Sequence, residues 1–204
     1  PDYTFDPLFM SFLDSVINWA EAEEIFLLLD NHSYDLDLVN NLAFETALIS
    51  MWKQIALRYK NRSDYIIYEI QNEPHDITDN SWGIIQGNVI EAIRDIDTDR
   101  TLIVGPANWN NYNNLQYLPV YSDDNLIYTF HFYDPFLFTH QGAGWTDPSM
   151  ASVTGIPFPY SETDMPESPT ELSGTWVETL YTNYPGDGTG EKIREWLNVA
   201  LEFR

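Results

Sequence analysis

Four short apolar runs, separated by segments of helical periodicity, restrict the fold of this chain more than any other feature. The runs occupy residues 25–29, 65–70, 101–104 and 126–132, and they are rich in β-branched and aromatic residues, as strands buried in a parallel sheet are. Apolar residues recur at helical spacing in residues 7–22, 42–59, 82–96 and 190–204, and more weakly in 115–120. Strands that alternate with helices indicate βαβ units, and therefore an α/β fold.

Polar residues follow each of the four predicted strands. They are Asp30-Asn31-His32, Gln71-Asn72-Glu73-Pro74-His75, Asn108-Trp109-Asn110 and His131-Phe132-Tyr133. Functional groups at the carboxyl ends of consecutive strands are typical of a (β/α)₈ TIM barrel. The rival, an open doubly wound sheet, usually carries a Gly-rich phosphate turn, which this sequence lacks. A closed barrel needs eight strands, so either some strands are not recognisable in this sequence or the chain is the middle of a longer barrel.

Residues 134–190 form a long stretch rich in Pro, Gly, Ser, Thr and acidic residues. The prolines of this stretch, Pro185 among them, argue against a long helix here. We predict an extended loop with a short helix near residues 175–182. Loops of this length are uncommon unless they are functional or mobile. Neither repeats nor a linker divide the sequence, so residues 1–204 are predicted to form one partial catalytic domain.

The chain is strongly acidic, with 9 Lys and Arg against 32 Asp and Glu and a formal net charge of −23. Nucleic acids and anionic membranes attract basic surfaces, so they are excluded as main partners. There is no cysteine, and the four His residues lack metal-ligand spacing, so we expect neither a metal nor a cofactor. No apolar run approaches the length of a membrane span, and the first residues lack a signal peptide's basic region.

Aromatic residues make up 15% of the chain, and aromatic faces stack well on the C–H faces of sugar rings. Most of these rings are expected to be core residues. Trp109, which follows the third predicted strand, and Trp145, in the long loop, are candidate sugar platforms. Core packing is the alternative for both.

The Asn72-Glu73-Pro74 triplet closes the second predicted strand. It sets a carboxylic acid at the mouth of the predicted barrel, where it can protonate a leaving glycosidic oxygen. Asn72 can donate to a substrate hydroxyl and hold the acid in place, and Pro74 ends the strand. The alternative is that Glu73 only caps the following helix.

This triplet, the earlier Leu29-Asp30-Asn31-His32-Ser33-Tyr34 and the later His131-Phe132-Tyr133 together resemble glycoside hydrolase family 5, the large cellulase family. The three motifs occur in the family's order and span about half of the chain. The resemblance implies a TIM barrel whose strands three to six are present, and a retaining endo-β-1,4-glucanase that hydrolyses β-glucan. Mannanase, xyloglucanase and lichenase are alternatives within the same family.

The resemblance also implies a role for each matching residue. Glu73 matches the general acid/base, and Asn72 the residue that binds the sugar 2-hydroxyl. His32 matches a histidine that contacts sugar hydroxyls, and His131 one that lines the site near the acid. Tyr133 matches the tyrosine that normally bonds the nucleophile. His140, in Thr139-His140-Gln141-Gly142, resembles a residue that shapes the cleft in some bacterial members.

The family's nucleophile, a Glu that ends strand seven, has no match in this sequence. Glu202 lacks a preceding Gly and an apolar strand, so we do not assign it, and Asp30 and Asp134 are weak candidates. Glu69 lies roughly 13 Å below Glu73 at about 3.3 Å per residue, too far for a retaining pair. The chain alone is therefore predicted to be inactive. A non-catalytic oligosaccharide-binding protein is the alternative from another class.

Half a barrel would leave two strand edges, at residues 25–29 and 126–132, which invite pairing. We therefore expect a swapped or complementing second half-barrel as a partner. Because polysaccharide does not enter cells, the parent protein is expected to be secreted or periplasmic.

Overall fold

The computed structural model describes residues 3–32 and 41–203, and it divides the chain into two compact units, residues 1–131 and 132–204. Ser33 and Tyr34 of the first sequence motif lie outside the described residues. That residues 1–204 form one catalytic domain stays a prediction.

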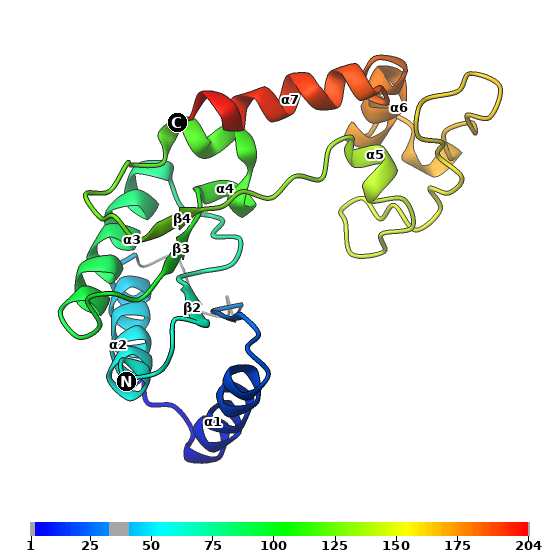
Figure 1. The fold of residues 1–204 in the computed structure, drawn as a ribbon. Coiled ribbons are helices and arrows are strands. Elements are labelled where there is room, and N and C mark those ends of the chain that lie inside the picture. The colour runs from blue at the N-terminus through cyan, green and yellow to red at the C-terminus, as the bar shows by residue number, and fades with distance from the viewer. Residues whose placement is uncertain (1–2, 33–40, 204) are drawn as a thin grey trace. The chain divides into compact units, whose positions relative to one another are not determined.

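The first unit contains the four predicted strands, each preceded by helical structure (Figure 1). Its elements are α1 (Pro7–Ala22), β1 (Leu27–Asp30), α2 (Asn41–Tyr59), β2 (Ile66–Glu69), α3 (Asp79–Arg94), β3 (Leu102–Val104), α4 (Ala107–Asn110), η1 (Tyr112–Tyr117) and β4 (Leu126–Tyr128). All the strand pairs are parallel and the order is β1-β2-β3-β4. The parallel α/β prediction is confirmed, and the weak helix expected at 115–120 is a 3-10 helix that begins earlier.

The two faces of the sheet differ. One face packs into the main core with side chains of α2 and α3, and its strand residues include Ile66, Tyr68, Leu102 and Val104. The strand register places Leu28, Ile67, Ile103 and Ile127 on the opposite face, and none of them belongs to that core. Helices outside and a separate inner face are the layers of a TIM barrel.

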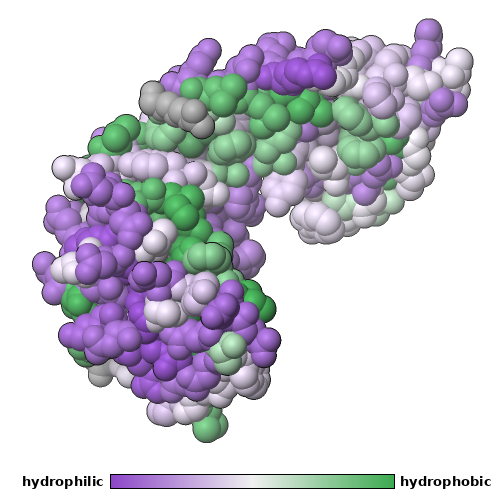
Figure 2. Space-filling model, viewed as in Figure 1, coloured by the Kyte–Doolittle hydropathy of each residue, from purple (hydrophilic) through white to green (hydrophobic). Residues whose placement is uncertain are grey.

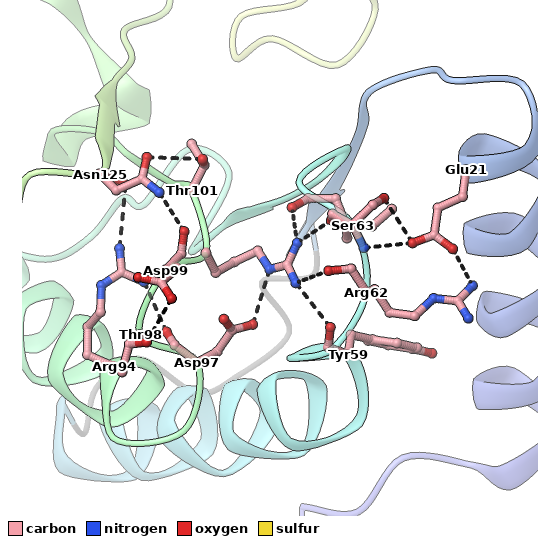
Figure 3. A network of polar contacts seen from close by, with 12 residues as sticks. Glu21, Tyr59, Arg62, Ser63, Arg94, Asp97, Thr98, Asp99, Thr101 and Asn125 are labelled. Carbon is pink, nitrogen blue, oxygen red and sulfur yellow. Dashed lines mark hydrogen bonds and ion pairs between the residues drawn. The ribbon is translucent and has the colours of Figure 1, made fainter.

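A buried arginine ties together the amino-terminal ends of β2 and β3 (Figure 3). Arg100 is 4% exposed, and its guanidinium donates to four backbone carbonyls and to the Asp97 carboxylate, which lies 3.1 Å away. The four carbonyls belong to Tyr59, Arg62, Ser63 and Ile66. Because this network lies at the end of the strands away from Glu73, we assign it to stability.

The second unit contains α5 (Phe136–Thr139), η2 (Thr170–Leu172), α6 (Trp176–Asp187) and α7 (Gly190–Glu202). The predicted short helix is confirmed, but it continues beyond its expected end near residue 182, through Pro185 to Asp187. A proline near the end of a helix removes few hydrogen bonds. The expected extended loop also has a core of its own, formed by Leu137, Ala143, Met150, Val153, Ile156, Leu172, Val177 and Tyr184.

Helix α7 has no buried residue, and Figure 2 shows hydrophilic residues along one side of it and hydrophobic ones along the other. Leu197 and Leu201 are among its exposed apolar residues. In the described part of the chain, no helix is long and apolar enough to cross a membrane.

Candidate active site

Glu73 lies four residues beyond the end of β2, and its backbone adopts the left-handed conformation with φ 45°. Its Oε1 atom lies 2.7 Å from Nδ1 of His131, which follows β4. Both side chains are partly exposed. The structure thus brings together two of the predicted site residues from strands that are not neighbours in the sheet.

Among the described residues, His131 is the side-chain partner of the Glu73 carboxyl group. That Asn72 holds the acid stays a prediction. The main chain of His131 is itself anchored, because its N–H donates to Asn110 O at 2.7 Å. A carboxyl group held at one oxygen and partly exposed can give and take protons.

His32 and Asn72 lie side by side at the ends of β1 and β2. Nε2 of His32 is 3.5 Å from Nδ2 of Asn72, and Nδ1 of His32 is 2.7 Å from Oδ2 of Asp30. The neighbouring Asn31 and Gln71 join the same strand ends, because Asn31 Nδ2 donates to Gln71 Oε1 at 2.7 Å. The structure therefore confirms that these strand ends converge.

Trp109 lies on a turn in which residues 108–110 all have positive φ, between 54° and 61°. Its backbone N–H donates to Pro74 O at 3.1 Å, so the turn is attached to the segment that carries Glu73. The half-exposed indole stacks on the ring of His75, with centroids 5.1 Å apart and planes 11° apart. The stack thus holds the Trp109 indole against a residue that lies two positions after Glu73 in the sequence.

The sequence does not predict that His75 stacks on Trp109. The signal in the sequence is the pair of asparagines that flank Trp109, because Asn tolerates the left-handed conformation. Such a turn can direct a large side chain back toward the preceding strand end.

Glu69 and Asp30 are register partners on β2 and β1, and they point to the same inner face of the sheet as Ile67 and Leu28. Burial raises the pKa of Glu69, and the Asp30 charge raises it further, whereas His131 and His32 oppose the shift. Glu69 is therefore a polar residue of the interior layer, as predicted.

Three predicted site residues lie in the second unit. Tyr133 meets the His140 ring edge-on at 5.4 Å, and His140 stacks on Phe136 with centroids 3.6 Å apart. Trp145 is 82% exposed on a loop that is closed by backbone hydrogen bonds between Ala143 and Met150 and between Gly142 and Met150. The structure brings Tyr133 and His140 together, and it presents Trp145 to solvent rather than in a core.

A pocket of about 400 Å³ lies between α1, β1 and α2. It includes His32 but not Glu73, so it is not the site of acid chemistry. Apolar side chains form most of its wall, namely Phe5, Phe9, Leu13, Leu28, Leu29, Met51, Trp52 and Ile55. Within residues 3–32 and 41–203, no group of three or more His, Asp or Glu is arranged to hold a metal ion.

Proteins of known sequence are similar to this chain over most of its length. Endoglucanase 3 of Fibrobacter succinogenes is 33% identical over 216 residues, covering 97% of this chain and 32% of the relative. Endoglucanase C of Acetivibrio thermocellus is 32% identical over 208 residues, covering 96% and 59%. The chain thus spans about a third to three fifths of the length of these relatives.

Solved structures agree with the half-barrel architecture. Cel5A of Thermotoga maritima, solved with cellobiose, is 29% identical with a TM-score of 0.73 over 98% of this chain and 59% of that one. The same enzyme solved with mannotriose is 28% identical, again with a TM-score of 0.73. A family model described as cellulase (glycosyl hydrolase family 5) matches residues 1–184. The chain therefore belongs to glycosyl hydrolase family 5.

Proposed function

We propose that the protein to which this chain belongs is a retaining endo-β-1,4-glucanase, and that Glu73 is its general acid/base. The observation that carries the proposal is the 2.7 Å contact of Glu73 with His131 at the carboxyl ends of the strands. It is supported by the endoglucanase names of the similar proteins. A glucan or oligosaccharide is the matching substrate class, as in the cellobiose complex of the Thermotoga enzyme.

Retaining hydrolysis proceeds in two steps. First, Glu73 gives its proton to the glycosidic oxygen while a second carboxylate attacks the anomeric carbon, so the leaving sugar departs as an alcohol. Then the Glu73 carboxylate takes a proton from water, whose oxygen displaces the enzyme carboxylate. We do not assign that second carboxylate. Glu202 is exposed at the end of α7, which confirms that it ends a helix and not a strand.

The sugar contacts follow from the placement of the polar and aromatic side chains. We propose that Asn72 and His32 bind hydroxyl groups beside Glu73, and that Trp109 stacks on a sugar ring. In the second unit, we propose that Trp145 is a further sugar platform, that Tyr133 bonds the nucleophile of the complete protein, and that His140 shapes the substrate cleft.

The test is hydrolysis of carboxymethylcellulose, lichenan and mannan by the full-length gene product with and without Glu73→Gln. Loss of an acid/base group lowers the rate by about 10²–10⁴. With Glu73→Ala and an aryl cellobioside whose leaving group needs no proton, added azide should restore turnover and yield the β-glycosyl azide, because azide needs no base. Glu195→Gln, an exposed residue paired with Lys192, is the matched control and should change nothing.

The non-catalytic alternative is tested on the 204-residue chain itself by calorimetric titration with cello-oligosaccharides beside an activity assay. Binding by the chain with no turnover by the full-length protein would favour it. Turnover by the pure chain would contradict the prediction that the chain alone is inactive.

We also propose that a second half-barrel covers the inner face of the sheet, and that the protein acts outside the cytoplasm, where polysaccharide is found. The first proposal is supported by the exposure of Leu28 on β1 and Ile127 on β4. The second is tested by assaying culture medium and periplasm of the source cells for the protein.

A further inference from the structure

We propose that Asp30 is a positioning residue that fixes the tautomer of His32 and, through it, the orientation of the Asn72 side-chain amide. That this arrangement serves sugar binding rests on the proposed function. The arrangement itself does not, because it follows from contacts among three side chains.

The contacts form a short chain of polar groups. Oδ2 of Asp30 lies 2.7 Å from Nδ1 of His32, and Nε2 of His32 lies 3.5 Å from Nδ2 of Asn72. A carboxylate can only accept, so Nδ1 of His32 must carry the proton. In the neutral imidazole, Nε2 is then an acceptor, and the group that it faces has to be the amide nitrogen of Asn72 and not its oxygen.

Packing does not hold the His32 ring, because its side chain is 77% exposed, whereas that of Asp30 is 26% exposed. Among the described residues, the partners of the ring are Asp30 and Asn72. The 2.7 Å bond to a charged acceptor is the stronger of the two, since 3.5 Å is the long limit for a hydrogen bond. Asp30 therefore orients the His32 ring, and the His32 ring in turn orients the side-chain amide of Asn72.

The main chain of Asn72 is fixed independently. Its backbone N–H donates to Asn31 O at 3.0 Å, and the Gln71 side chain donates to Asn31 O at 3.1 Å and to Asn72 O at 3.0 Å. What remains free at Asn72 is the rotation of its amide. The contact with His32 leaves the amide oxygen as the end that can accept from a ligand hydroxyl.

The test is a long-range ¹H–¹⁵N spectrum of the 204-residue chain with ¹⁵N-labelled histidine at pH 8, where an ordinary imidazole is neutral. We expect the Nδ1–H tautomer to dominate for His32. Asp30→Ala should lower the ratio of the Nδ1–H to the Nε2–H form by about ten-fold or more, as loss of a hydrogen bond to a charged group does. Asp30→Asn keeps an acceptor and should restore part of that ratio.

The chain contains a matched control, because His75 Nδ1 lies 2.7 Å from Asp76 Oδ2. Asp76→Ala should change the His75 signals and leave those of His32 unaltered. The side-chain NH₂ signals of Asn72 should move in Asp30→Ala but not in Asp76→Ala. A dominant Nε2–H form of His32 in the unaltered chain, or a tautomer ratio unchanged by Asp30→Ala in a chain that keeps its amide spectrum, would overturn the proposal.

Calorimetric titration with cellotetraose then separates this proposal from the proposed function. If this proposal and the proposed function both hold, Asp30→Ala weakens the binding of cellotetraose by about ten-fold. A chain that binds no oligosaccharide while His32 behaves as expected counts against sugar binding and supports the positioning role of Asp30.

Discussion

Nδ1 of His131 and Oε1 of Glu73 lie 2.7 Å apart although 58 positions separate them in the sequence. The contact joins the ends of β2 and β4 across the intervening strand β3. It explains how an acid on a left-handed turn keeps one orientation, because the His131 main chain is itself bonded to Asn110.

His131→Ala should therefore lower hydrolysis by the full-length protein. Loss of a hydrogen bond to a charged group corresponds to about 10–100-fold. The loss should be larger for unactivated cello-oligosaccharides than for an aryl cellobioside with a good leaving group, because only the former need proton donation. Comparing kcat/KM for the two substrates checks this, and equal losses would show that His131 does not act through Glu73.

Gly105→Ala should destabilise the first unit by about 1–3 kcal/mol, as overpacking does. A Cβ there would lie 2.8 Å from Oδ1 of the fully buried Asn110, whose backbone holds His131. The Gly105 carbonyl cannot move away easily, because it accepts from the side chains of Trp82 and Gln86.

Gly186→Ala in α6 is the control, because nothing lies within 4 Å of its added Cβ and Ala favours a helix. Thermal unfolding should show a lower Tm for Gly105→Ala and no loss for Gly186→Ala. Equal Tm values for Gly105→Ala and the unaltered chain would contradict the close packing of Asn110.

Periodicity predicted the elements of the first unit well, most clearly where one apolar stripe of a helix is buried. In α3, the regularly spaced Trp82, Ile85, Val89 and Ile93 are all buried. The stripe in the first helix was less informative. Leu8, Phe12 and Trp19 share a face that is exposed, and α1 buries Met10, Ile17 and Ala20 instead. A helix with apolar residues around much of its surface does not reveal which side is covered.

The second unit was harder to predict, because its core is built from residues without a regular period. Ala143, Met150, Val153 and Ile156 lie outside any helix or strand and are nevertheless buried. In the candidate site, the residue types and strand ends identified Glu73 and His131. The contact of Asp30 with His32 depends on side-chain conformations at a strand end, which no periodicity describes.

Glu69→Gln should stabilise the chain at pH 7 and have little effect at pH 4. The pKa of Glu69 is raised in the folded state by burial and by Asp30, so ionisation costs more in the folded than in the unfolded chain. The stability that Glu69 contributes when protonated is lost as the pH rises through its folded pKa, and a neutral Gln avoids that loss. A gain of 1 kcal/mol would raise the Tm by roughly 2–4 °C.

Asp123→Asn is a matched variant whose expected effect on stability has the opposite sign to that of Glu69→Gln. The hydrogen bond from Arg94 lowers the pKa of Asp123, so its contribution is present above the unfolded pKa and is lost as the pH falls through the folded one. This variant should lower the Tm at pH 7 and lose that effect in acid. If both variants changed the Tm in the same direction between pH 4 and pH 7, the raised pKa of Glu69 and the lowered pKa of Asp123 would both be contradicted.

The two edge strands, β1 and β4, expose apolar side chains on the inner face of the sheet. Leu28 on β1 and Ile127 on β4 are 48% and 45% exposed, whereas their neighbours Ile67 and Ile103 on the same face are buried. Apolar side chains beside unpaired strand edges favour association. If a second copy supplies the missing half, light scattering should give about twice the 23.7 kDa of the chain.

Leu28→Lys should then shift this assembly toward the monomer, because a charge on the inner face would be buried by the partner at a cost of several kcal/mol. Leu57→Lys is the control, since Leu57 lies exposed on α2 and outside the inner face, and it should leave the mass unchanged. A single monomeric species for the unaltered chain would rule out the second copy. The relatives extend well beyond the part that this chain matches, so further strands of a longer protein would then be the candidate cover of the inner face.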